Sequence, residues 1–193
     1  MTVEPGSVRS VAQLIEAAQG EERIKYVFFW GHAPAADGSV TSACFSQWWP
    51  VKFTVDGHDY RSAEHFMMAG KALLFGDPEM AERIRAVEHP AEAKKLGRLV
   101  SGFDEDTWKG KRFEIVVQAS VAKFGQHPEL RDYLLATGER VLVEASPRDR
   151  IWGIGMGAKN ADAESPELWR GQNLLGFALM EARERLRKVA AAA

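Results

Sequence analysis

The stretch from Tyr60 to Phe75 constrains the fold more than any other part of this chain. It is apolar on nearly every side when wound as a helix, and a helix of that kind belongs in a protein interior. Ser62 is placed to cap its first turn, because a serine oxygen can accept a free backbone N–H there. Gly76 can adopt the left-handed conformation that ends many helices. We therefore predict a buried helix between Ser62 and Gly76.

This apolar segment nevertheless carries two charged residues, Glu64 and Lys71. Their spacing corresponds to two helical turns, so they share one face about 10 Å apart along the axis, with Met68 between them. A buried charge without a partner is costly in free energy. Either the two charges pair with other groups in the core, or they line a cavity.

Composition bounds what the rest of the chain can be. The chain has 193 residues, of which 46% are hydrophobic and 27% charged, and this suits one domain with a sizeable core. A formal net charge of −2 excludes a global basic field of the kind that drives non-specific nucleic-acid binding. The single cysteine, Cys44, excludes an intramolecular disulfide and a cysteine zinc cluster. With neither a secretory nor a membrane-length apolar run, we expect a cytoplasmic protein without a membrane partner.

Hydrophobic periodicity predicts mostly helices with a few short strands. Residues 1–20 are predicted to form an accessory helix or extension, and residues 21–189 the main domain. A tight Asp56-Gly57 turn predicts a hairpin just before the central helix. Asp106 is predicted to cap the long helix, and Lys94 and Lys95 are expected on a solvated face. Helices are expected at 7–19, 62–75, 78–89, 91–98, 107–124, 128–135 and 174–189, and strands at 25–30, 51–55, 58–60 and 140–145.

Aromatic residues are dense at 43–50, where Ser46, Gln47 and Trp48 stand together. This segment is either a corner of the core or an aromatic platform for a flat ring, with Ser46 and Gln47 as its hydrogen-bonding partners.

A second candidate segment lies at 146–157, where Asp149 stands between Arg148 and Arg150 and is followed by Trp152 and Gly153. Three glycines at alternate positions would let the backbone approach a ligand closely. Their spacing fits neither a dinucleotide-binding fingerprint nor a P-loop. The segment is therefore either a surface loop of ion pairs or the wall of a cavity.

The remaining chemistry points away from metals, because the five histidines show no ligand spacing. Two carboxylates, Glu64 and Asp149, suit cleavage of a glycosidic bond. A desolvated Lys71 suits nucleophilic attack on a carbonyl or anomeric carbon. Arginines suit phosphate and indoles suit a flat ring, so the residues alone predict a pocket for an aromatic, phosphorylated small molecule.

Four blocks in order resemble the NADAR (YbiA-like) family. Residues 60–66, followed by Lys71, are similar to its Ser-x-Glu-His helix with a lysine seven positions after the glutamate. Residues 45–50 resemble its Leu-Ser-Asn-Phe-Tyr-Pro segment, although Gln47 stands where asparagine is usual. Trp108 with Arg112 resembles the start of its long helix. Residues 146–155 resemble its Asp-x-x-Trp-Gly-x-Gly loop, with a closing helix from 171–176.

The resemblance implies a mainly α-helical, single multihelical domain and N-glycosidase activity without metal or cofactor. Its substrates would be phosphoribosylated riboflavin-pathway intermediates or ADP-ribosylated guanine, with ADP-ribosylated DNA or RNA as the matching partner. Lys71 would be the nucleophile that forms an imine at the ribose C1, and Glu64 and Asp149 would move protons. Phosphate, base and ribose would contact Arg61, His65, Ser46, Gln47, Trp48, Trp108, Arg148, Arg150, Trp152 and Gly153. The alternative is a non-catalytic module that binds ADP-ribose or a nucleotide.

Overall fold

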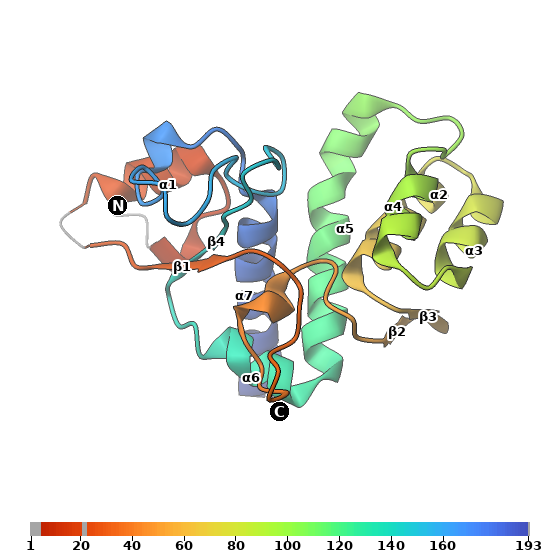
Figure 1. The fold of residues 1–193 in the computed structure, drawn as a ribbon, viewed down its shortest axis with the longest axis horizontal. Coiled ribbons are helices and arrows are strands. Elements are labelled where there is room, and N and C mark those ends of the chain that lie inside the picture. The colour runs from red at the N-terminus through yellow and green to blue at the C-terminus, as the bar shows by residue number, and fades with distance from the viewer. Residues whose placement is uncertain (1–4, 21–22, 193) are drawn as a thin grey trace. The chain divides into compact units, whose positions relative to one another are not determined.

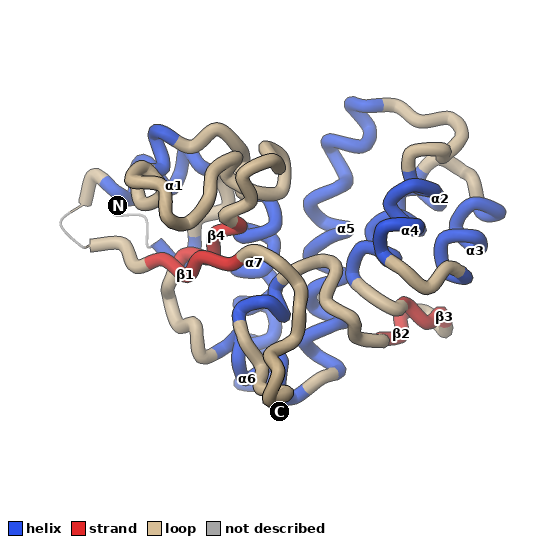
Figure 2. The backbone as a smooth tube through the Cα atoms, in the orientation of Figure 1, coloured by secondary structure: helices blue, strands red, loops and turns tan. Residues whose placement is uncertain are grey.

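A computed structural model of the chain describes residues 5–20 and 23–192 (Figure 1). The described residues form seven α-helices and four short strands, so the prediction of a mainly α-helical fold with a few short strands is confirmed (Figure 2). They group into two compact units. The first consists of the described residues up to Ser46 and from Glu129 onward, and the second of Gln47–Pro128.

The second unit is a helical cluster around the predicted central helix. Helix α2 (Ala63–Leu74) packs against α3 (Pro78–Ala86), α4 (Pro90–Gly97) and α5 (Glu105–Gln126), as Figure 1 shows. Most of α2 is buried, including Ala69 and Ala72, which have no exposed surface. Small side chains at these positions let the neighbouring helices approach the axis of α2 closely.

Both predicted ends of α2 are confirmed. The Ser62 hydroxyl oxygen accepts the backbone N–H of His65, which satisfies one of the free donors of the first turn. Gly76 has a φ of +71°, the left-handed conformation that a side chain would strain.

A short hairpin leads into α2, as the sequence predicts. Strand β2 (Phe53–Val55) pairs antiparallel with β3 (His58–Tyr60). The turn has positive φ at Asp56 (50°) and Gly57 (77°), which matches a type I′ turn and the twist of the strands it joins.

The long helix α5 begins earlier than the sequence predicts. Its cap is Asp104, whose carboxylate accepts the backbone N–H of Thr107 at 2.8 Å, so the prediction of Asp106 as the cap is wrong. Asp104 has extended backbone angles, as a cap requires, whereas Asp106 already lies in the first helical turn. Acidic residues favour that turn because they complement the positive end of the helix dipole.

The first unit is built on a pair of parallel strands, β1 (Tyr26–Phe29) and β4 (Val141–Glu144). Helix α7 (Leu174–Ala192) packs on β4. The remaining elements of this unit are short: η1 (Pro5–Ser7), α1 (Val11–Ala18), η2 (Ser42–Phe45), α6 (Pro128–Leu135) and η3 (Pro166–Leu168).

Asn173 joins α7 to the outer edge of β4. Its amide oxygen accepts the Glu144 N–H at 2.9 Å, and its amide nitrogen donates to the Leu142 carbonyl at 2.9 Å. The side chain thereby makes the hydrogen bonds that a neighbouring strand would otherwise make with these two backbone groups. Asn173 is fully buried and has a φ of +52°, a conformation that asparagine tolerates better than most residues.

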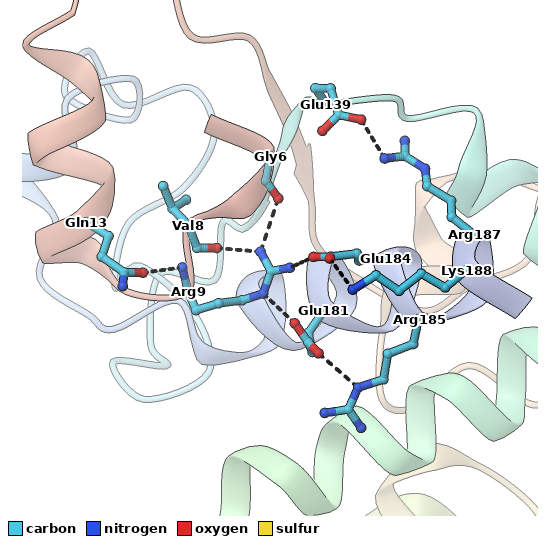
Figure 3. A network of polar contacts seen from close by, with 10 residues as sticks. All are labelled: Gly6, Val8, Arg9, Gln13, Glu139, Glu181, Glu184, Arg185, Arg187 and Lys188. Atoms are coloured by element: carbon cyan, nitrogen blue, oxygen red, sulfur yellow. Dashed lines mark hydrogen bonds and ion pairs between the residues drawn. The ribbon is translucent and has the colours of Figure 1, made fainter. Parts of the chain in front are cut away.

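The described part of the N-terminal extension is attached to α7. Arg9 donates to the carboxylates of Glu181 and Glu184, each at 2.8 Å, and also to the Gly6 and Val8 carbonyls (Figure 3). This fork of contacts uses the planar geometry of guanidinium. The predicted domain boundary after residue 20 stays a prediction.

Candidate functional site

Lys71 lies in the last turn of α2 and is half-buried. Its ammonium Nζ donates to the Gly97 carbonyl oxygen at 2.8 Å. The same atom lies 4.2 Å from the centroid of the Phe103 ring and 5.7 Å from that of Trp108. The amine is therefore enclosed by one carbonyl and two aromatic rings, both of which can attract a cation.

This enclosure changes how readily Lys71 gives up its proton. Burial lowers the pKa of Lys71 below its usual value, and the negative charge of Glu105 opposes that effect. A lowered pKa increases the fraction of neutral amine near pH 7, and only the neutral form is a nucleophile. Burial of Lys71 thus favours the chemistry that the sequence predicts for it, while the two rings attract the ammonium form and oppose that effect.

Glu64 lies in the first turn of the same helix and is only 3% exposed. Its backbone N–H donates to the Gln47 carbonyl at 2.9 Å, which attaches the segment after residue 46 to the start of α2. Met68, on the same face, lies against the last residue of α4: a Cβ added at Gly97 would lie 3.0 Å from Met68 Cγ. The end of α4 therefore covers the middle of the face that carries Glu64 and Lys71.

Residues 47 and 48 make two side-chain contacts that the sequence leaves open. The Lys94 ammonium lies 5.9 Å from the centroid of the half-buried Trp48 ring, so Lys94 is not simply solvated as predicted. The Gln47 amide is buried and points to the Met67 sulfur at 3.9 Å. A ring beside a cation is a suitable surface for a flat base that carries phosphate.

His65 is a core residue in this structure. It has no exposed surface, its Nδ1 lies 2.7 Å from the Ser62 hydroxyl, and its Nε2 lies 3.2 Å from the Val87 carbonyl. Burial lowers the pKa of His65, so the ring is neutral and its Nε2–H donates to Val87. These contacts fix the start of α2, while the predicted contact of His65 with substrate stays a prediction. Arg61 lies just before α2 and is exposed.

The other predicted residues lie in the first unit, where Asp149 organises its own loop. One of its carboxylate oxygens accepts the N–H groups of Ile151 at 2.8 Å and Trp152 at 2.7 Å. Its own N–H donates to the Ser146 hydroxyl at 3.2 Å. Bonds of this kind shape a tight turn. Arg148 and Arg150 are exposed, Ser46 and Trp152 are half-buried, and Gly153 is buried.

Gly153 of this loop and Gly171, further along the chain, permit a close approach of backbone to backbone. A Cβ at Gly153 would lie 2.8 Å from the Glu144 carbonyl oxygen, and one at Gly171 would lie 2.8 Å from Arg150 Cα. Gly155 has a φ of +69°. The structure thus gives Gly153 and Gly155 a packing reason that does not require a ligand, whereas a Cβ at Gly157 would meet only Pro147 Cγ, at 3.8 Å.

Two residues that contact Lys71 were not predicted from the sequence. Gly97 supplies the carbonyl partner of Lys71, and Phe103 supplies its nearer ring, but neither belongs to a recognisable motif. Arg112, which the resemblance pairs with Trp108, lies one turn after it and is only 6% exposed. Within residues 5–20 and 23–192, no group of histidine, cysteine and acidic side chains could hold a metal ion, and no helix is long and apolar enough to span a membrane.

Comparison with known proteins gives a consistent result. The pattern of the NADAR domain matches residues 28–187. N-glycosidase R617 of Acanthamoeba polyphaga mimivirus is 44% identical over 168 residues, which cover 84% of this chain and 97% of that protein. N-glycosidase YbiA of Escherichia coli (strain K12) is 38% identical over 138 residues, covering 72% and 76%. The NMR structure of E. coli YbiA matches with a TM-score of 0.70 and 31% identity, covering 91% of this chain and 92% of that one.

Proposed function

The chain belongs to the NADAR domain family, and from that premise we propose that it hydrolyses the N-glycosidic bond of a ribosylated heterocycle. Relatives from the virus and from E. coli carry the name N-glycosidase, and the alignments cover most of both chains. The observation that carries the proposal is the enclosure of Lys71, whose pKa is lowered by burial beside two aromatic rings.

Lys71 acts as the nucleophile in this mechanism. Its neutral Nζ forms a bond to the ribose C1 as the bond between C1 and the base nitrogen breaks. The bonding electron pair leaves with the base, which takes up a proton from a carboxylic acid, the role given to Glu64. The attached nitrogen then loses its two protons, one to the carboxylate that protonated the base and one to the ring oxygen, as the bond between C1 and the ring oxygen breaks, which leaves an open-chain ribose joined to Lys71 as an imine. Water then adds to the imine carbon, and the amine departs, so the sum is hydrolysis.

Two substrate classes fit this reaction, phosphoribosylated riboflavin-pathway intermediates and ADP-ribosylated guanine in DNA or RNA. The formal net charge of −2 favours a small phosphorylated metabolite, because it offers no general attraction for a polyanion. Trp48 and Lys94 supply a ring and a cation that suit a base and a phosphate. Asp149 lies in the first unit, and its part in proton transfer stays a prediction. Base release by Asp149→Asn tests it.

The test is to incubate the chain separately with ribosylaminouracil phosphate and with ADP-ribosylated DNA and to measure the free base. Wild type is compared with Lys71→Ala and with the control Lys188→Ala, an exposed lysine of α7 whose ammonium pairs with Glu184. We expect release by wild type and the control and none by Lys71→Ala. Release that is undiminished in Lys71→Ala refutes the role of Lys71.

Borohydride distinguishes the covalent route from simple attack by water. Reduction of the imine should attach one ribosyl product irreversibly to wild type but not to Lys71→Ala, as intact-mass measurement would show. The rival function is a non-catalytic binding module. It predicts saturable binding of both substrates with no base released by any variant.

A further inference from the structure

The segment between α4 and α5, residues 98–104, runs directly over the end of α2. It starts after Gly97, whose carbonyl accepts the Lys71 ammonium, and it ends at Asp104, the cap of α5. It carries Phe103, which is 43% exposed although it is a large apolar side chain. Exposure of this size leaves apolar surface in water at a cost, so the position of the ring calls for an explanation.

One face of Phe103 explains that position. Its ring centroid lies 4.2 Å from Lys71 Nζ, which is well within the range of an attraction between a cation and an aromatic face. Phe75, at the end of α2, meets the same ring edge to face, with the ring centroids 5.3 Å apart and the planes at 64°. Phe103 is thus held in one orientation while it covers the amine.

Asp77 fixes the path of the segment. One carboxylate oxygen accepts the Ser101 N–H at 2.9 Å, and the other accepts the Met80 N–H at 3.1 Å. The same side chain therefore caps α3 and holds the segment two residues before Phe103. Gly102 allows the sharp turn between them, with a φ of +66° and a position where a Cβ would lie 3.4 Å from the Phe75 carbonyl.

We propose that Phe103 is a positioning residue that holds the Lys71 ammonium between catalytic turnovers, and that Asp77 keeps Phe103 in place. This inference rests on the proposed role of Lys71 as the nucleophile. The ring attracts the ammonium form and has no comparable attraction for the neutral amine. Lys71 is therefore held while it is charged and released toward substrate once it has lost its proton.

The test measures Lys71 directly, without substrate, in the full chain. Lysine labelled with ¹³C is titrated by NMR, and the Lys71 signal is identified by its loss in Lys71→Arg. Phe103→Leu keeps an apolar side chain but removes the ring, so Lys71 should lose its proton at lower pH than in wild type. The fraction of neutral amine at a fixed pH should rise about two- to fivefold, the factor that an exposed cation–ring contact represents.

Three further variants make the result specific. Phe103→Tyr keeps a ring and should restore the wild-type titration. Leu99→Ala, on the same segment and 59% exposed, should leave it unchanged. Asp77→Asn replaces one accepting oxygen with a donor and should move the Lys71 titration in the same direction as Phe103→Leu. Because this variant also removes a negative charge, Asp106→Asn, which removes an exposed charge in the first turn of α5, serves as its control.

The outcomes separate this inference from the proposed function. A purely structural role for Phe103 predicts lower thermal stability with an unchanged Lys71 titration, and that result overturns the inference. An effect of Phe103→Leu without an effect of Asp77→Asn overturns the part assigned to Asp77. Loss of the proposed function would show instead as base release that survives Lys71→Ala, which leaves the titration result standing.

Discussion

Substitution of alanine for Gly97 tests the packing that brings α4 onto α2. The new Cβ would lie 3.0 Å from Met68 Cγ and 3.2 Å from Met68 Cβ, and closer still to the sulfur. A clash with the end of a flexible side chain could be relieved by rotation of that end. Contacts near the base of the side chain require Met68 as a whole to move, or α4 to shift away from α2.

The expected cost follows from two opposing contributions. Overpacking of a filled interior destabilises by about 1–3 kcal/mol. Alanine is a better helix former than glycine by up to about 1 kcal/mol, and less than that at the end of α4. We expect Gly97→Ala to lower the free energy of unfolding by about 1–2 kcal/mol. Because the Gly97 carbonyl is the partner of Lys71, we also expect base release to slow.

Urea denaturation followed by circular dichroism measures the change. Gly110→Ala is the matched control, since this exposed glycine of α5 has nothing within 4 Å of an added Cβ and should gain up to about 1 kcal/mol. Met68→Ala removes the contacts with the sulfur and Cγ and leaves only the one with Cβ, so Gly97→Ala should cost much less in that background. If Gly97→Ala stabilises the chain as Gly110→Ala does, or costs as much without the Met68 side chain, the reasoning from this contact is refuted.

Three other changes test separate parts of the structure. The pKa of His65 is lowered from 6.5 by burial, so the unfolded chain binds a proton more readily than the folded chain. The free energy of unfolding should therefore fall as the pH drops below about 6.5. Urea midpoints measured from pH 7.5 to 5 should fall less steeply for His65→Gln than for wild type. Asn173→Ala removes two hydrogen bonds to β4 and leaves buried backbone groups unpaired. We expect the free energy of unfolding in urea to fall by about 2–4 kcal/mol, and an unchanged urea midpoint would contradict this. Arg9→Ala removes two part-buried ion pairs to α7 and should cost about 1 kcal/mol, a loss that high salt should reproduce in wild type if charge attraction is the cause.

Local chemistry determined most of the secondary structure of this chain. The Ser62 cap and the positive φ of Gly76 end α2 where the sequence predicts, because both depend on backbone groups within a few residues. The Asp56-Gly57 turn likewise fixes its hairpin. The cap of α5 shows the limit of such reasoning: two nearby aspartates can both cap a helix, and neighbouring structure decides between Asp104 and Asp106.

The sequence also indicated the residues with unusual chemistry, but it did not supply their partners. It placed Glu64 and Lys71 on one face of a buried helix, since helical spacing alone requires this. It did not show that Lys71 meets the Gly97 carbonyl and the Phe103 ring, residues that are 26 and 32 positions away in the chain. It left the loop with the alternate glycines open between a surface loop and a cavity wall, whereas the tertiary structure shows that Gly153 lies directly against the Glu144 backbone.

The physical reason for this division is distance along the chain. Caps, turns and helical faces follow from interactions between residues a few positions apart, which the sequence displays directly. The pKa of Lys71 depends on burial, and burial depends on helices that are brought together only by packing. The sequence alone therefore determined that this chain has a buried helix with an amine in it. Only the tertiary structure decided what encloses that amine.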